Sequence, residues 1–296
     1  MADMRRLFMN VFSKMARHVA SAYIAGPEVD DAIRVCHQID RHGWRSTICP
    51  WDGPHDAPEA VASKYREALH AIKRERLDCY LSIKAPSINY SIATLAEFID
   101  ISSDHNLRIH FDAMSPDSAS PSFALLERAA VLYNNFGCTL PSRWMRSTSD
   151  ARKALELGVA VRLVKGQWPD TDSPGIDPRE NYLRLVDLLA GKARHVAIAT
   201  HDASLAMESL RRLQLHGTSC ELEQLFGLPL FAARDVRSLG IGVRLYVPYG
   251  CAYLPYAISE IKKRPVILKW FLKDLVAGNN ALKGLGFGVK ADRKCS

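Results

Sequence analysis

Short runs rich in β-branched and apolar residues alternate along the chain with longer stretches in which apolar residues recur every three or four positions. The first pattern is typical of buried strands and the second of amphipathic helices, several of which end at glycine or asparagine. The strand-type runs occupy residues 45–49, 79–84, 108–112, 138–140, 159–164, 196–200, 220–225 and 243–247. Eight strands that alternate with helices predict a parallel sheet closed into a (β/α)8 barrel of the TIM type.

The same pattern predicts a single domain over residues 1–296. A length of 296 residues allows two domains, but α/β barrels often run as one, and no linker or low-complexity segment divides the chain. We expect additional helices at both ends, in an N-terminal extension over about residues 1–25 and a C-terminal helix and tail over about residues 253–296. The N-terminal segment carries charges through its apolar pattern, so it fits an amphipathic helix, also one lying on the inner face of a membrane, better than a signal peptide.

Composition narrows the cellular setting and the classes of partner. The net charge of +7 is spread along the chain, as on solvated helix faces, so no nucleic-acid partner is predicted. Seven cysteines without a C-x-x-C pair favour reduced thiols, a cytoplasmic location and no metal site. No apolar run reaches the roughly 18 residues that a membrane-spanning helix needs.

Polar residues gather where the predicted strands end, which in this fold is where active sites are built. Each has a structural explanation when taken singly, and their convergence is what indicates a site. Their donors and flat rings suit an anionic, aromatic cofactor. A sugar phosphate with Lys165 as a Schiff-base nucleophile is less favoured, because the loops after strands seven and eight contain little glycine to grip a phosphate. The residues are Lys84, Asp112, Arg143, Arg162, Lys165, Trp168, His201, Glu221, Glu223, Gln224, Arg244 and Tyr246.

Four of these strand ends resemble the signature strands of the proline dehydrogenases. The segments RLVKG, ATHDA, ELEQLFG and RLYVPYGCAYLPY occur in the family's order, and the resemblance covers about residues 20 to 270. It implies a distorted (β/α)8 barrel that binds FAD without covalent attachment and takes a hydride from the carbon next to a substrate nitrogen. It also implies a small-molecule amine as substrate and an electron acceptor, either a quinone or oxygen.

The resemblance also implies roles for individual residues. On the catalytic side it places Lys84, Asp112, Tyr246 and Tyr256, of which Lys84 and Tyr256 also contact the substrate. The residues that it assigns to FAD binding are Arg162, Lys165, Gly166, Trp168, Thr200, His201 and Gln224.

Two departures from the family pattern bear on cofactor and substrate. Pro141 stands where the family has a glutamine that hydrogen-bonds the flavin, and proline offers no donor. Ser259 and Glu260 stand where two adjacent arginines would clamp the substrate carboxylate. A carboxylate ~4 Å from an ionised glutamate is repelled by about 4 kcal/mol at an effective dielectric near 20.

The residues at positions 259 and 260 therefore predict a proline analogue or another amine as substrate, rather than free proline. Two alternatives stay open. One is ordinary proline dehydrogenase activity, with Lys84 or Arg143 as the carboxylate partner. The other is a degenerate, non-catalytic barrel that binds a partner.

Overall fold

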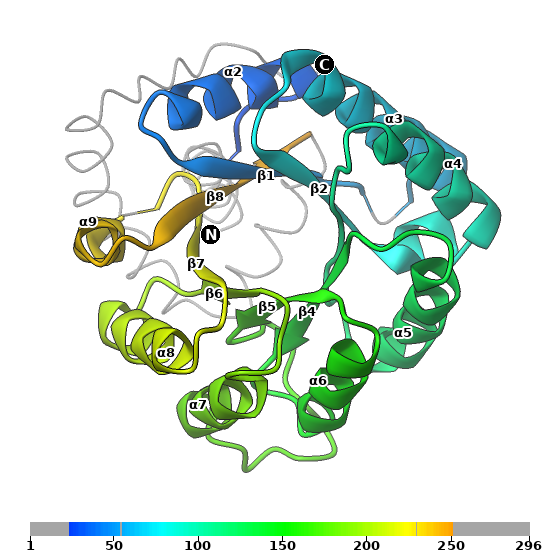
Figure 1. The fold of residues 1–296 in the computed structure, drawn as a ribbon. Coiled ribbons are helices and arrows are strands. Elements are labelled where there is room, and N and C mark those ends of the chain that lie inside the picture. Colours follow the sequence, from blue (N-terminus) through cyan, green and yellow to red (C-terminus); the bar gives the residue numbers. More distant parts are fainter. Residues whose placement is uncertain (1–23, 54, 229, 251–296) are drawn as a thin grey trace, which may run out of the picture.

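All eight predicted strands form, and each pairs in parallel with its neighbours in chain order until β8 closes on β1. The computed structural model describes residues 24–53, 55–228 and 230–250, and the barrel lies within them (Figure 1). The strands are β1 (Arg45–Pro50), β2 (Cys79–Ile83), β3 (Ile109–Phe111), β4 (Phe136–Pro141), β5 (Ala160–Val164), β6 (Val196–Ala199), β7 (Cys220–Leu225) and β8 (Gly242–Tyr249). The predicted N-terminal and C-terminal extensions lie outside the described residues, as do Tyr256, Ser259 and Glu260.

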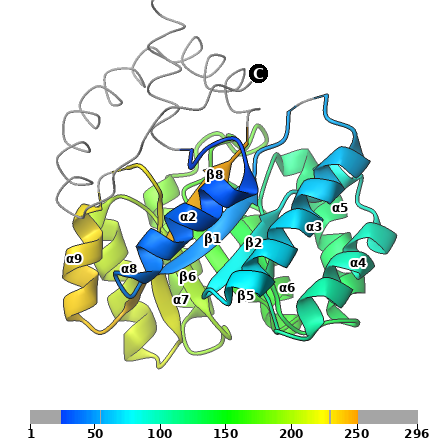
Figure 2. The ribbon, with the colours of Figure 1, turned by 90° about the horizontal axis from the view of Figure 1, so that it is seen from above.

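Helices form a ring around the strands, as Figures 1 and 2 show from two directions. α2 packs against β1 and β8, so it covers the seam where the barrel closes. Its first turn is stabilised by a capping box between Glu28 and Asp31. The helices are α2 (Val29–Asp40), α3 (Pro58–Glu75), α4 (Ile92–Ser103), α5 (Pro116–Ala130), α6 (Ser147–Glu156), α7 (Pro178–Leu189), α8 (Ala203–Leu215) and α9 (Phe231–Ser238), with a short 3₁₀ helix η1 (Ala85–Ile88) after β2.

The strand bounds differ from the predicted ones by two residues at the start of β4, which begins at Phe136 rather than Cys138, and at the end of β8, which ends at Tyr249 rather than Val247. Gly137 resembles a helix stop in the sequence, yet it pairs with His110 on β3 and Ala160 on β5. A Cβ atom at Gly137 would lie 2.2 Å from Nδ1 of His110. Glycine is therefore needed in this strand because a neighbouring side chain occupies the space.

The apolar core lies between the barrel and its helices, and the inside of the barrel is polar. Outward side chains such as Leu81, Leu163 and Leu222 are completely buried under the helices. A TIM barrel is commonly filled by layers of branched apolar side chains. Here the inward positions of the strands carry buried polar residues instead: Thr47, Tyr80, Ser82, His110, Thr139, Arg162, Glu221, Glu223 and Arg244.

The described residues carry neither a membrane-spanning helix nor a metal cluster. None of the described helices is both long and apolar enough to cross a membrane. Within the same part of the chain, no group of three or more His, Cys, Asp and Glu side chains is arranged to hold a metal ion. Five cysteines there are free thiols: Cys36, Cys49, Cys79, Cys138 and Cys220.

Candidate active site

Arg162 lies at the centre of the upper half of the barrel, and only 3% of its side chain is exposed. Its Nε donates to Glu223 Oε2 at 2.8 Å, and its Nη1 donates to Asp112 Oδ1 at 2.6 Å. Nη2 donates to the hydroxyl of Tyr80 at 3.1 Å, and the guanidinium carbon lies 5.1 Å from the centre of the Tyr246 ring. The structure therefore places Arg162 below the rim, in a buried ion pair with Glu223 and a partly buried one with Asp112, rather than exposed at the rim.

Asp112 and Tyr246 lie above Arg162 at the mouth of the barrel. The Tyr246 hydroxyl donates to Asp112 Oδ2 at 2.7 Å, and the thiol of Cys49 donates to the same oxygen at 3.7 Å. Burial and the neighbouring Asp112 carboxylate raise the pKa of Tyr246 well above its usual value. Burial and Asp112 likewise raise the pKa of Cys49 to about 12. Both groups consequently stay protonated at neutral pH and act as donors to Asp112.

Lys84 lies beside this pair and is held by Asp52, a residue that sequence analysis did not single out. The Lys84 ammonium donates to Asp52 Oδ1, and the hydroxyl of Ser87 donates to Asp52 Oδ2. Both side chains of the ion pair are 12% exposed. Burial alone would lower the pKa of Lys84, but its interactions with Cys49 and Asp52 outweigh burial and raise it. Lys84 is therefore a cation at the barrel mouth whose charge is partly compensated by a loop carboxylate.

The segment after β5 carries three of the predicted cofactor residues to the rim. The side chain of Lys165 is exposed, and Trp168 is half-buried. Gly166 has a φ of +87°, and a Cβ atom there would lie 2.7 Å from Cβ of Pro141. Both the positive φ and the close approach of Pro141 therefore favour glycine at position 166.

Thr200, His201 and Gln224 come together at the tops of β6 and β7. Nε2 of His201 accepts from the backbone N–H of Leu225 at 3.0 Å, and the Gln224 amide nitrogen donates to the carbonyl of Thr200 at 3.2 Å. The Thr200 hydroxyl accepts from the N–H of Asp202, the N-cap of α8, at 3.1 Å. The predicted phosphate-binding pair therefore lies at the N-terminus of a helix, where anions are favoured.

Two buried polar atoms near this rim have no hydrogen-bond partner among the described residues. They are Oε1 of Gln224 and Nε of Arg143, an acceptor and a donor. Buried polar atoms are almost always paired in folded proteins, so these two atoms are candidates for pairing with a polar group that binds at the rim. Together with the exposed cation of Lys165, this donor and acceptor set fits an anionic cofactor such as FAD.

Two of the residues grouped at the rim by sequence analysis lie at the opposite end of the barrel. Glu221 is the second residue of β7 and Arg244 the third residue of β8, so both start their strands rather than end them. Arg244 Nε donates to Glu221 Oε1 at 2.8 Å, and Nε2 of His195 lies 3.2 Å from that oxygen. The Arg244 guanidinium lies 4.4 Å from the centre of the Tyr80 ring, which separates this pair from Arg162.

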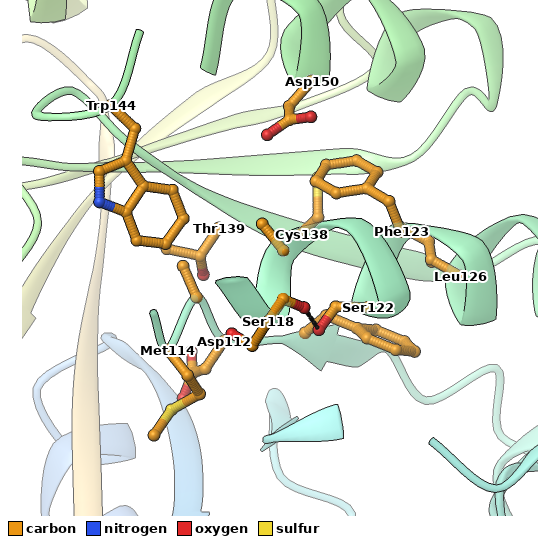
Figure 3. A pocket seen from close by; sticks show the side chains of 13 residues that line it. Asp112, Met114, Ser118, Ser122, Phe123, Leu126, Cys138, Thr139, Trp144 and Asp150 are labelled. Carbon is orange, nitrogen blue, oxygen red and sulfur yellow. Dashed lines mark hydrogen bonds between the residues drawn. The ribbon is translucent and has the colours of Figure 1, made fainter. Parts of the chain in front are cut away.

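Two pockets lie on the Asp112 side of the barrel mouth. Figure 3 shows the first, between α5 and strands β3 and β4, with Asp112 and Trp144 among its walls. Its volume of about 20 Å³ suits one water molecule rather than a ligand. The second is an open depression of about 420 Å³ lined by Tyr90, Met114 and Trp168, among others. Only the second has room for part of a cofactor or substrate.

Curated relatives match nearly the whole chain. Proline dehydrogenase 1 of Bacillus subtilis is 23% identical over 276 residues, which cover 87% of this chain and 90% of the relative. Proline dehydrogenase 2 of the same species is 20% identical over 284 residues, with coverage of 89% and 94%. Proline dehydrogenase of Deinococcus radiodurans is 23% identical over 287 residues, with coverage of 88% and 91%. No protein-family profile matches the chain.

Solved structures agree on the fold. Proline utilization A (PutA) of Bdellovibrio bacteriovorus, inactivated by N-propargylglycine, superposes with a TM-score of 0.70 at 15% identity and covers 83% of this chain. A mutant PutA of Bradyrhizobium japonicum gives a TM-score of 0.65 at 17% identity and covers 81%. This chain spans about a third of the length of these PutA chains, 32% and 30% respectively.

Proposed function

We propose that this chain, which is similar to proline dehydrogenases over most of its length, is a flavin-dependent oxidoreductase that oxidises the CH–NH bond of a small amine with FAD as its cofactor. The observation that carries the proposal is the match over 87% of this chain and 90% of the relative, which includes every strand end that builds the barrel mouth. That mouth holds Arg162, Asp112, Tyr246 and Lys84 in one hydrogen-bonded and charged group.

The rim supplies the groups that would hold FAD. Thr200 and His201 at the N-terminus of α8 and the exposed cation of Lys165 suit the phosphates, and Trp168 offers a flat apolar face. Gln224 brings an unpaired acceptor, and Gly166 lets the backbone turn at the rim. When bound, FAD supplies the acceptor for the hydride that leaves the carbon next to the substrate nitrogen. Deeper in the barrel, the Arg162 guanidinium offsets part of the negative charge of Asp112 and Glu223.

L-Proline is the substrate that the names of the relatives favour. Its carboxylate needs a cation, and Lys84 is the cation at the barrel mouth, with Arg143 as a second source of an unpaired donor. Asp112 and Tyr246 form the neighbouring polar wall, where Asp112 can accept from the substrate ammonium. Lys84 would thus bind the substrate carboxylate, and Asp112 would bind the substrate amine.

A substrate other than free proline is the second candidate, and it rests on the sequence at Ser259 and Glu260. A glutamate in place of an arginine clamp would repel a carboxylate and favour a neutral or cationic group. Prolinamide, an ester or a cyclic amine would then be preferred over L-proline.

Comparison of three substrates tests both candidates. The ratio of kcat/KM for L-proline, L-prolinamide and pyrrolidine is measured with the wild-type protein and with Lys84→Met. If L-proline is the substrate and Lys84 holds its carboxylate, the variant loses about 10- to 100-fold in kcat/KM for L-proline, the worth of one charge-assisted hydrogen bond, and little for pyrrolidine. A wild-type preference for prolinamide or pyrrolidine over L-proline would instead establish the second candidate.

A further inference from the structure

We propose that Glu223 is a positioning residue that holds the Arg162 guanidinium inside the barrel and sets the net charge that this part of the barrel presents to bound flavin. The inference rests on the proposed function, because it concerns an FAD enzyme. It adds a residue to which neither the family resemblance nor the comparisons assign a role.

Glu223 makes only buried contacts, and all of them converge on Arg162 or its neighbours. Oε2 accepts from Arg162 Nε at 2.8 Å and from the Tyr80 hydroxyl at 3.1 Å. Oε1 accepts from the Thr47 hydroxyl at 2.9 Å. The carboxylate is 2% exposed and comes from β7, on the far side of the barrel from β3, which Asp112 directly follows. The guanidinium is therefore held from two sides at once.

The charges around Arg162 do not balance. One guanidinium faces two carboxylates, those of Asp112 and Glu223, at 2.6 and 2.8 Å. Besides Arg162, each carboxylate accepts from two neutral hydroxyls: Asp112 from Tyr246 and Ser82, and Glu223 from Tyr80 and Thr47. With both carboxylates ionised, this trio carries a net charge of −1. Loss of the Glu223 charge would make it neutral and would ease the addition of negative charge above it.

The chain supplies its own matched control in Glu221. It lies two residues earlier on the same strand and the same face, is completely buried, and pairs with an arginine, Arg244, at 2.8 Å. Glu221→Gln therefore perturbs a buried carboxylate and arginine pair of the same kind, at the end of the barrel away from the mouth. A purely structural role for Glu223 predicts the same consequences for both substitutions.

The midpoint potential of bound FAD distinguishes an electrostatic role of Glu223 from a purely structural one. At an effective dielectric near 20, removal of one unit charge roughly 10 Å from a second charge changes the equilibrium that forms the second charge by about tenfold. Two-electron reduction leaves negative charge on the flavin, so Glu223→Gln should favour the reduced form by about tenfold, which raises the potential by about 30 mV. Glu223→Asp, which keeps the charge, and Glu221→Gln should each stay within about a third of that shift. Thermal stability is recorded for every variant.

Thr47→Val keeps the test decisive if Glu223→Gln fails to fold. It removes a neutral donor to Oε1 and leaves the carboxylate less compensated, so we expect a shift of about threefold in the opposite direction, toward oxidised flavin. Equal potentials in Glu223→Gln and Glu221→Gln, or no opposite shift in Thr47→Val, would overturn the inference. A wild-type protein that takes up no FAD would instead refute the proposed function.

Discussion

Replacement of Arg162 by alanine tests whether the buried ion pairs at the barrel mouth hold the fold as well as the site. The substitution leaves Asp112 and Glu223 without their guanidinium partner, and Glu223 is 2% exposed. Removal of one partner from a buried ion pair costs about 3–5 kcal/mol, because the remaining charge stays desolvated and uncompensated. In a domain of this size each kcal/mol lowers Tm by about 2–4 °C, so we expect a loss of roughly 6–20 °C.

The assay is thermal unfolding followed by far-UV circular dichroism on protein stripped of FAD, so that loss of cofactor does not contribute. Arg184→Ala is the control, because Arg184 forms an exposed ion pair with Glu180 and its removal should leave Tm nearly unchanged. Adding Glu223→Gln to Arg162→Ala should recover part of the loss, since it removes one uncompensated charge. A Tm within 2 °C of wild type for Arg162→Ala would show that these ion pairs do not stabilise the fold.

Three further predictions concern groups around the same site. Burial and the nearby arginines hold the pKa of His110 well below its usual value, so the unfolded chain takes up a proton near pH 6.5 that the folded chain does not. The free energy of unfolding should therefore decrease by up to about 1.4 kcal/mol for each pH unit below 6.5. Urea unfolding at pH 7 and at pH 5 measures this decrease, which should be smaller in His110→Gln than in the wild type. Gly137→Ala should lower stability by about 1–3 kcal/mol in the same assay, because its Cβ would lie 2.2 Å from the His110 ring; an unchanged midpoint would contradict this packing. Asp52→Asn should lower KM for L-proline severalfold by freeing Lys84, whereas Ser87→Ala, which keeps the charge of Asp52, should not; equal KM values would argue against Lys84 as the carboxylate partner.

The barrel itself could be predicted from sequence because it depends on local patterns. Eight β-type runs separated by helical periodicity predict the strand order, and the closed parallel barrel confirms it. The predicted start of β4 was wrong because Gly137 resembles a helix stop in the sequence. Its place in the sheet depends on a contact with His110, which lies 27 residues earlier in the chain. Local propensity cannot report such a contact.

The arrangement of charges inside the barrel could not be predicted from the same patterns. Glu221 and Glu223 are separated by one residue and share a face, yet one pairs with Arg244 near the bottom and the other with Arg162 near the mouth. Asp52 was missed because it comes from a loop after β1 and meets Lys84 across 32 residues of sequence. Residue type and spacing place a charge on a strand, and only the register of eight strands decides its partner.

Anaerobic titration of the purified protein with L-proline tests whether the chain binds FAD and oxidises a small amine with it. After reconstitution with FAD and removal of free cofactor, the oxidised-flavin absorbance band is followed as L-proline is added without oxygen. We expect a yellow protein whose band bleaches, with one flavin reduced per substrate molecule oxidised. A protein that retains no FAD, or one whose flavin stays oxidised with L-proline, L-prolinamide and pyrrolidine alike, would contradict it.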